Sequence, residues 1–219
     1  MPVEQDPRRQ LFDDWAAHYD PSIQDRGDFP FDSYEIVLDE IVTLADPHRG
    51  MTVLDLGIGT AKLATRFAKL GCDIWGIDFS AEMLVKARET LPQAVLVQAD
   101  LVGEWPSQLE RRFDRIVSGY VLHEFDLAAK VALLQRLVER HLTAEGRIVI
   151  GDIAFATSRA REEAHRQWAD TWDEEEHYWA ADEATAACAR AGLEVVYRQV
   201  SSCGGIFVIE SLTQGRSHR

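Results

Sequence analysis

The sequence of 219 residues lacks any apolar run close to the roughly 18 residues that a membrane-spanning helix needs. Its first 14 residues are polar and acidic, without the apolar core of a signal peptide. Basic residues are also few: 23 Lys and Arg stand against 37 Asp and Glu, which gives a net charge of −14. Nucleic acids and anionic membranes are bound through clustered Lys and Arg, so neither is expected to be the main partner. We expect a cytoplasmic protein.

Cysteine is scarce as well. The three cysteines, Cys72, Cys188 and Cys203, are far apart and odd in number, which argues against a disulfide framework and a cysteine-based zinc site. The seven histidines show no H-x-x-x-H or similar spacing of ligands. No metal site is expected.

The sequence does have a regular alternation of strand and helix patterns. Strands are expected at 52–56, 73–77, 95–98, 115–118 and 147–150. Helices are expected between them at 61–70, 81–91 and 127–140, and an amphipathic helix at 34–44 precedes the first strand. Five such units predict a parallel, doubly wound α/β sheet. After a helix at 183–190, strands at 193–200 and 205–211 are joined by a short link that predicts an antiparallel hairpin.

The first strand runs into a glycine turn, Asp55-Leu56-Gly57-Ile58-Gly59-Thr60-Ala61, which opens a helix. Gly57 and Gly59 allow unusual backbone dihedral angles and a close approach to a ligand. The N-terminus of the following helix offers unpaired N–H groups. Taken alone, the pattern is also compatible with an ordinary strand-to-helix turn.

Acidic residues follow the next two strands. Asp78 lies 21 residues after Gly57, near the distance at which nucleotide-binding βαβ units place an acid that accepts hydrogen bonds from ribose hydroxyls. Asp100 follows the third strand. Open α/β folds bind ligands at the carboxyl ends of their strands. Asp55, Asp78 and Asp100 together therefore indicate a nucleotide-type site.

Position 62 separates two kinds of cofactor. The dinucleotide pattern G-x-G-x-x-G/A requires Gly or Ala there, and this chain has Lys62. The turn that ends at Ala61 instead resembles the first motif of class I methyltransferases, which use S-adenosylmethionine (SAM). In that family the loop holds the methionine part of the cofactor, and Asp55 suits an ammonium group better than a phosphate. An NAD(P)-dependent oxidoreductase is the alternative, disfavoured by Lys62 and the hairpin.

The resemblance extends over most of the chain. Segments 76–84 and 98–100 resemble the second and third motifs, segments 113–123 and 146–150 the fourth and fifth strands, and the hairpin strands six and seven. It implies a Rossmann-like, seven-stranded, mostly parallel sheet with a C-terminal antiparallel hairpin. It also implies cofactor-binding positions at Asp78 (ribose), Phe79, Asp100 (adenine amino group) and Leu101.

The N-terminal segment 12–20 is similar to a helix that covers SAM in small-molecule methyltransferases, which implies that Tyr19 lies near the methionine end. We therefore expect a single domain over 1–219, with an N-terminal helical cover at 1–46 and a core at 47–219. Many family members carry a third glycine where this chain has Ala61. The chain also lacks an Asp/Asn-Pro-Pro-aromatic motif after the fourth strand, which argues against an amino-methylating nucleic-acid enzyme of that type.

A helical insertion is expected near 157–182. Its aromatic residues, Trp168, Trp172, Tyr178 and Trp179, are expected to pack from an amphipathic helix onto the sheet or the N-terminal helices. A wall over a small substrate is the alternative function for these rings. The acidic run 173–176 is expected to be a solvated helix face.

The resemblance predicts SAM-dependent methyl transfer to a small molecule; a non-enzymatic SAM-binding sensor is a further alternative. His123 is the candidate general base, because it follows the fourth strand and an ordinary pKa of roughly 6.5 suits proton transfer near neutral pH. Tyr120 and Glu124 flank it and are placed to orient the acceptor or the base. A purely structural role, capping or packing the loop, is the alternative for His123.

Overall fold

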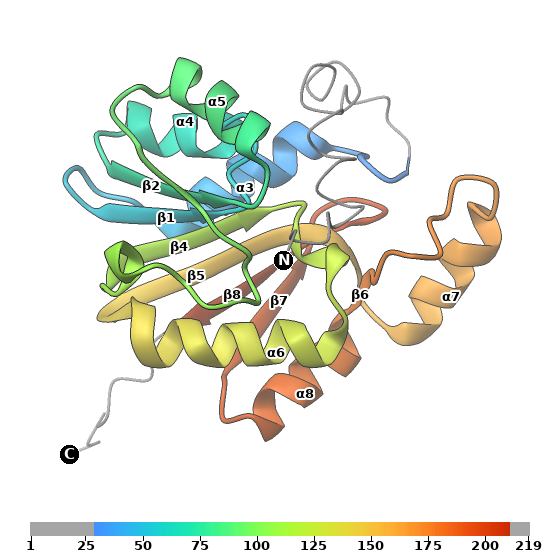
Figure 1. The fold of residues 1–219 in the computed structure, drawn as a ribbon. Helices are drawn as coiled ribbons and strands as arrows, with labels where there is room; N and C mark the ends of the chain where they lie inside the picture. Colours follow the sequence, from blue (N-terminus) through green and yellow to red (C-terminus); the bar gives the residue numbers. More distant parts are fainter. Residues whose placement is uncertain (1–28, 211–219) are drawn as a thin grey trace, which may run out of the picture.

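The computed structural model describes residues 29–210, which form one open sheet with helices on both of its faces (Figure 1). Seven strands follow in the order β3-β2-β1-β4-β5-β8-β7, and the two-residue strand β6 pairs with β5 outside this path. The strands are β1 (Thr52–Leu56), β2 (Asp73–Asp78), β3 (Val95–Gln98), β4 (Phe113–Gly119), β5 (Leu142–Phe155), β6 (Trp179–Ala180), β7 (Val195–Gln199) and β8 (Gly204–Glu210).

The pairing confirms the predicted sheet. Strands β1 to β5 pair in parallel, and β8 alone is antiparallel to its neighbours β5 and β7. The hairpin formed by β7 and β8 therefore closes the sheet with one antiparallel strand, as expected. Because β1 to β4 are parallel, their carboxyl ends share one edge of the sheet.

Two hydrophobic layers hold the helices on the sheet. The α-helices are α3 (Tyr34–Ala45), α4 (Lys62–Lys69), α5 (Ala81–Thr90), α6 (Leu127–Arg136), α7 (Ser158–Gln167) and α8 (Ala181–Arg190). Side chains of α3 and α4 belong to one buried cluster, and side chains of α6 and α8 belong to the other. None of the helices within residues 29–210 has the length and apolarity needed to cross a membrane.

Local signals place the helix starts near the site. The Ser80 hydroxyl accepts a hydrogen bond from the backbone N–H of Met83, which begins α5 at the predicted residue. The Asp126 carboxylate does the same for Ala129 and begins α6. Helix α6 then changes into a π-helical turn over Leu137–His141, within the single helix expected for 127–140.

Strand β5 is longer than expected. The predicted strand covers residues 147–150, whereas β5 runs from Leu142 to Phe155. Gly151 and Asp152 thus lie inside β5, and Gly151 faces α3. A Cβ atom at Gly151 would come within 2.6 Å of Ile41 and 2.8 Å of Val37. Glycine at 151 thus lets α3 approach the sheet, and it does not end the strand.

The expected amphipathic helix with four aromatic rings is wrong. Helix α7 ends at Gln167, so Trp168 caps it and Trp172 and Tyr178 lie in the following loop. Trp179 lies on β6, where its indole N–H reaches a buried carboxylate in β5. Trp168, Trp172 and Tyr178 share Phe29 as a partner, whereas Trp179 packs on Phe207. The acidic run 173–176 is likewise in this loop and not on a helix.

Candidate active site

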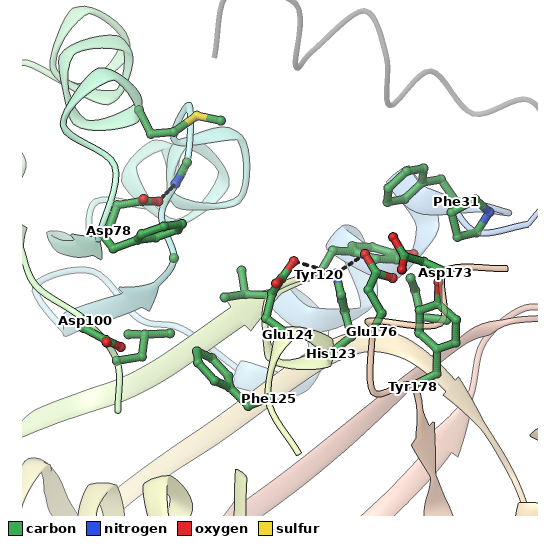
Figure 2. A pocket seen from close by; sticks show the side chains of 18 of the residues that line it. Phe31, Asp78, Asp100, Tyr120, His123, Glu124, Phe125, Asp173, Glu176 and Tyr178 are labelled. Carbon is green, nitrogen blue, oxygen red and sulfur yellow. Dashed lines mark hydrogen bonds and ion pairs between the residues drawn. The ribbon is translucent and has the colours of Figure 1, made fainter. Parts of the chain in front are cut away.

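A cavity of about 250 Å³ opens at the carboxyl ends of the parallel strands. One half, called here the glycine half, is lined by Gly57, Gly59, Asp78, Phe79, Met83, Ala99, Asp100 and Leu101. The other half, called here the histidine half, includes Tyr120, His123, Glu124, Phe125, Glu176 and Tyr178. Figure 2 shows Asp78 and Asp100 on one side of the cavity and the His123 group on the other. Of the predicted cofactor-binding residues within 29–210, all except Asp55 line the cavity. Tyr19 and segment 12–20 lie outside the described residues.

The glycine turn has the left-handed backbone that favours glycine. Gly57 has φ 68° and Gly59 has φ 53°. A Cβ atom at Gly57 would come within 2.6 Å and 2.7 Å of the two methyl groups of Val121, whereas at Gly59 the nearest atom would be 4.0 Å away. Gly57 is thus packed against the loop after β4, and the space beside Gly59 is open. Ala61 also has a positive φ, 69°, which explains why a third glycine suits this position.

Asp78 ties the glycine turn to the end of β2. Its carboxylate accepts hydrogen bonds from the backbone N–H groups of Gly59 and Ser80, both at 2.9 Å. Dashed lines in Figure 2 show the first of these bonds. The two bonds orient the carboxylate, which offers about four lone-pair sites in total. This orientation suits the acceptance of hydroxyl hydrogen bonds from a ribose.

Asp55 lies behind the turn. It is buried, and one of its carboxyl oxygens has no hydrogen-bond partner within residues 29–210. Burial, and next the charge of Asp78, raise the pKa of Asp55 well above its usual value. Its carboxyl group hydrogen-bonds to the backbone of Ala64 in α4, so Asp55 connects β1 to α4 and does not line the cavity.

Asp100 and Leu101 form the far wall of the glycine half. The Asp100 carboxylate accepts a hydrogen bond from the backbone N–H of Val102, at 3.0 Å, and its backbone carbonyl accepts one from the indole N–H of Trp105, at 3.1 Å. Leu101 is buried. Together with Phe79 it gives this end of the cavity the apolar surface that a purine ring requires.

His123 is held by a buried carboxylate. Its Nδ1 atom lies 2.6 Å from Oδ1 of Asp152, whose other oxygen accepts a hydrogen bond at 2.9 Å from the indole N–H of Trp179. On the cavity side, Nε2 of His123 lies 3.6 Å from Glu176 and 3.9 Å from Glu124 (Figure 2). Asp152 therefore fixes the imidazole so that Nε2 faces the two glutamates.

The surroundings of His123 favour its charged form. Burial alone would lower its pKa, but the charge and hydrogen bond of Asp152, followed by the charges of Glu176 and Glu124, outweigh it and raise the pKa to about 9. The same pair works in reverse on Asp152, where burial would raise the pKa and the bond to His123 lowers it. In this geometry the imidazole is protonated at neutral pH, which is the opposite of what a general base needs.

Tyr120 begins the loop after β4 with a left-handed backbone, φ 57°. Its ring packs against Phe31 and Tyr34, with centroid distances of 5.6 and 4.9 Å. The hydroxyl is buried and has no hydrogen-bond partner within residues 29–210. Burial raises the pKa of Tyr120, so the side chain stays a neutral hydroxyl.

Sequence reasoning missed two contributors to the histidine half, Asp152 and Glu176, and named Tyr178 only in the alternative that the aromatic rings form a wall over a small substrate. Asp152 was hidden because it lies within a strand whose end was misplaced. Glu176 belongs to the acidic run that was expected to be solvated, and Tyr178 follows it. The structure brings this loop to the cavity through a hydrogen bond of 2.7 Å from the backbone N–H of His177 to the carbonyl of His123.

Comparisons with known proteins identify the family. Residues 53–146 match the family described as "Methyltransferase domain". An uncharacterized methyltransferase of Geobacillus kaustophilus is 30% identical over 212 residues, which cover 93% of this chain and 96% of that protein. The chain belongs to the class I SAM-dependent methyltransferases. It is therefore a methyltransferase whose cofactor is SAM, and the NAD(P)-dependent alternative is wrong.

Solved structures show the same fold. The DhpI–SAM–HEP complex superposes with a TM-score of 0.72 at 19% identity and covers 96% of this chain and 100% of that one. The magnesium protoporphyrin IX methyltransferase of Synechocystis PCC 6803, solved with S-adenosylhomocysteine, has a TM-score of 0.68 at 15% identity over 93% of this chain and 97% of its own.

Proposed function

We propose that this methyltransferase acts on a small molecule bound in the histidine half of the cavity. The observation that carries the proposal is the division of one cavity into two chemically different halves. The glycine half holds nearly all the residues that the family resemblance assigns to the cofactor. The histidine half of the same cavity has aromatic walls and a few convergent polar groups, which is typical of small-molecule sites.

The residues of the glycine half fit SAM. The open backbone beside Gly59 leaves room for the methionine part, and the oriented Asp78 carboxylate suits the ribose hydroxyls. Phe79 and Leu101 provide apolar walls for the adenine, with Asp100 at the rim. SAM supplies an electrophilic methyl group on a sulfonium.

The chain's own contribution is to position the acceptor and exclude water, since a direct displacement gains much of its rate from alignment. We propose that the segment 1–46 covers the cofactor, with Tyr19 near the methionine end. In the histidine half, Tyr120 offers a neutral hydroxyl and His123 a charged N–H donor at neutral pH. His123 is placed to orient an acceptor through a hydrogen bond, whereas the Tyr120 hydroxyl is buried and Tyr120 contributes to the wall of the cavity.

Two observations support a small acceptor. The net charge of −14 disfavours a nucleic-acid substrate. The Synechocystis neighbour is named for methylation of magnesium protoporphyrin IX, which is a small molecule.

The test is transfer of label from methyl-labelled SAM into a metabolite extract fractionated by size. We expect labelled product in the small-molecule fraction and not in protein or nucleic acid. His123→Ala should keep SAM affinity and lose about 10²-fold or more in kcat on the identified acceptor. Label confined to macromolecules would refute the small-molecule proposal, and an unchanged kcat would make His123 a structural residue.

A further inference from the structure

The group His123, Glu124 and Glu176 has a use beyond orienting an acceptor. One ligand atom from each residue can be chosen so that all three lie within 4.8 Å of one another, and residues 29–210 contain no other such group of His, Cys, Asp or Glu. Figure 2 shows both glutamates directed toward the imidazole. We propose that these three side chains bind a divalent transition-metal ion, with Zn²⁺ and Mn²⁺ as the best matches.

The spacing suits such an ion. Metal–ligand bonds of about 2.0–2.2 Å place neighbouring ligand atoms roughly 3.4 Å apart in a tetrahedral site. The distances from Nε2 of His123 to Glu176 and Glu124 are 3.6 and 3.9 Å, and all three ligand atoms lie within 4.8 Å of one another, so small movements of the two glutamate side chains toward one point would bring them to bonding positions. One imidazole and two carboxylates form a mixed nitrogen and oxygen set, which favours Zn²⁺ or Mn²⁺ over Ca²⁺.

The support behind these ligands is an independent observation. His123 is 6% exposed, and within residues 29–210 its Nε2 makes no hydrogen bond shorter than the contacts of 3.6 and 3.9 Å to the two glutamates, while Nδ1 is fixed at 2.6 Å by Asp152. A histidine that binds metal through one nitrogen almost always donates its other N–H to such a partner. Tyr178 lies on the other side, where burial and then the neighbouring Glu176 carboxylate raise the pKa of its hydroxyl. The imidazole is thus oriented toward the two glutamates.

A metal ion at this point would leave coordination positions open toward the cavity. Those positions would suit an acceptor with an oxygen ligand, since a bound cation polarises a hydroxyl and eases loss of its proton. Because only a neutral imidazole binds a metal, the ion would displace the Nε2 proton that the surroundings of His123 favour at neutral pH. His123 would then hold the metal and would serve neither as a general base nor as an N–H donor. This last step rests on the proposed function; metal binding itself does not.

Metal binding is tested by calorimetry on the full chain after chelator treatment, with ZnCl₂, MnCl₂ and MgCl₂ as separate titrants and no SAM present. We expect one saturable site for Zn²⁺ or Mn²⁺ and a weaker response to Mg²⁺. Glu176→Gln should reduce the affinity at least tenfold. Asp152→Asn, which removes the charged partner of Nδ1 and changes no metal ligand, should reduce it by about 10- to 100-fold.

The matched control is Glu174→Gln. Glu174 lies in the same loop and contacts exposed His165 at 2.8 Å, so it reports on adventitious surface binding. It should bind metal as the wild type does. Co²⁺ gives a second readout, because its visible absorption band should be lost in His123→Asn. SAM titrations of each variant without metal show whether the fold and the glycine half are intact.

Absence of saturable binding up to 1 mM metal, about 4 kcal/mol of binding free energy, would overturn the proposal. So would binding that is lost in Glu174→Gln and kept in Glu176→Gln. If SAM binds and transfers its methyl group while metal does not bind, the metal site is wrong and the proposed function stands. If metal binds and no small molecule is methylated, the metal site stands and the proposed function is wrong.

Discussion

The glycine turn supports a sharp test of how its two glycines differ. Gly57 and Gly59 share a left-handed backbone, but only Gly57 has a neighbour where a side chain would be. Gly57→Ala should therefore destabilise the protein by two separate costs, and Gly59→Ala by one. Val121 supplies the difference, because its two methyl groups lie at 2.7 Å or less from the position of the new Cβ.

The magnitudes follow from these contacts. A non-glycine residue in the left-handed region costs about 1–2 kcal/mol. Overpacking a rigid core position costs about 1–3 kcal/mol more, and Val121 yields poorly because a β-branched side chain has few rotamers. We expect the free energy of unfolding to fall by about 2–5 kcal/mol in Gly57→Ala and by about 1–2 kcal/mol in Gly59→Ala.

Urea unfolding without SAM measures both values, and a third variant tests the cause. Val121→Ala removes the two clashing methyl groups, so combined with Gly57→Ala it should be less destabilising than the sum of the two single changes by 1 kcal/mol or more. Equal destabilisation by the two glycine variants, or strict additivity with Val121→Ala, would refute the packing argument. Gly59→Ala should instead weaken SAM binding, because its methyl group would enter the open side of the turn.

Three further outcomes are expected. Asp78→Ala should weaken SAM binding by about 1–3 kcal/mol in calorimetry, because the ribose hydroxyls lose a charged acceptor, and wild-type affinity would contradict that assignment. Asp55→Asn should gain stability relative to the wild type as pH rises from 5 to 8. The raised pKa means that folded wild-type protein keeps a proton on Asp55, which the unfolded chain releases above about pH 4. The stability of the wild type therefore falls as pH rises, and the variant lacks this loss. If urea unfolding gives the same difference in unfolding free energy between variant and wild type at pH 5 and pH 8, the raised pKa of Asp55 is not supported. Deleting residues 1–20 should lower SAM affinity while the melting temperature of the remaining chain changes little; unchanged affinity would remove the proposed cover.

The sheet was predictable because its signals are local. Each strand from β1 to β4 is a short β-rich run with a glycine or an acid at its end or within two residues after it. The Ser80 hydroxyl marks the start of α5. The glycine half of the cavity was predictable for the same reason, since its residues lie at or next to the strand ends. Where the prediction failed, at Gly151, the residue serves a contact with Ile41 that is distant in sequence.

The histidine half could not be predicted in the same way, because its geometry depends on contacts between distant segments. Phe29 stacks on Trp168 and Trp172 at centroid distances of 5.0 and 5.4 Å, and Tyr178 meets Trp172 edge-on at 4.5 Å. These rings hold the loop after α7 against the segment before α3. Such a cluster leaves no periodic pattern in the sequence. From the sequence alone, the acidic run beside it therefore has the pattern of a solvated surface.

Two backbone carbonyls then set the position of the loop over the site. The carbonyl of His123 accepts a hydrogen bond from the N–H of His177, and the carbonyl of His177 accepts one from the buried ammonium of Lys130. Because Glu176 directly precedes His177, the loop cannot shift without moving this carboxylate relative to the imidazole. The glycine half is thus determined by strand ends, and the histidine half by the packing of one loop. Acceptor specificity should accordingly vary among relatives with the loop 168–178, while the glycine turn keeps the same cofactor.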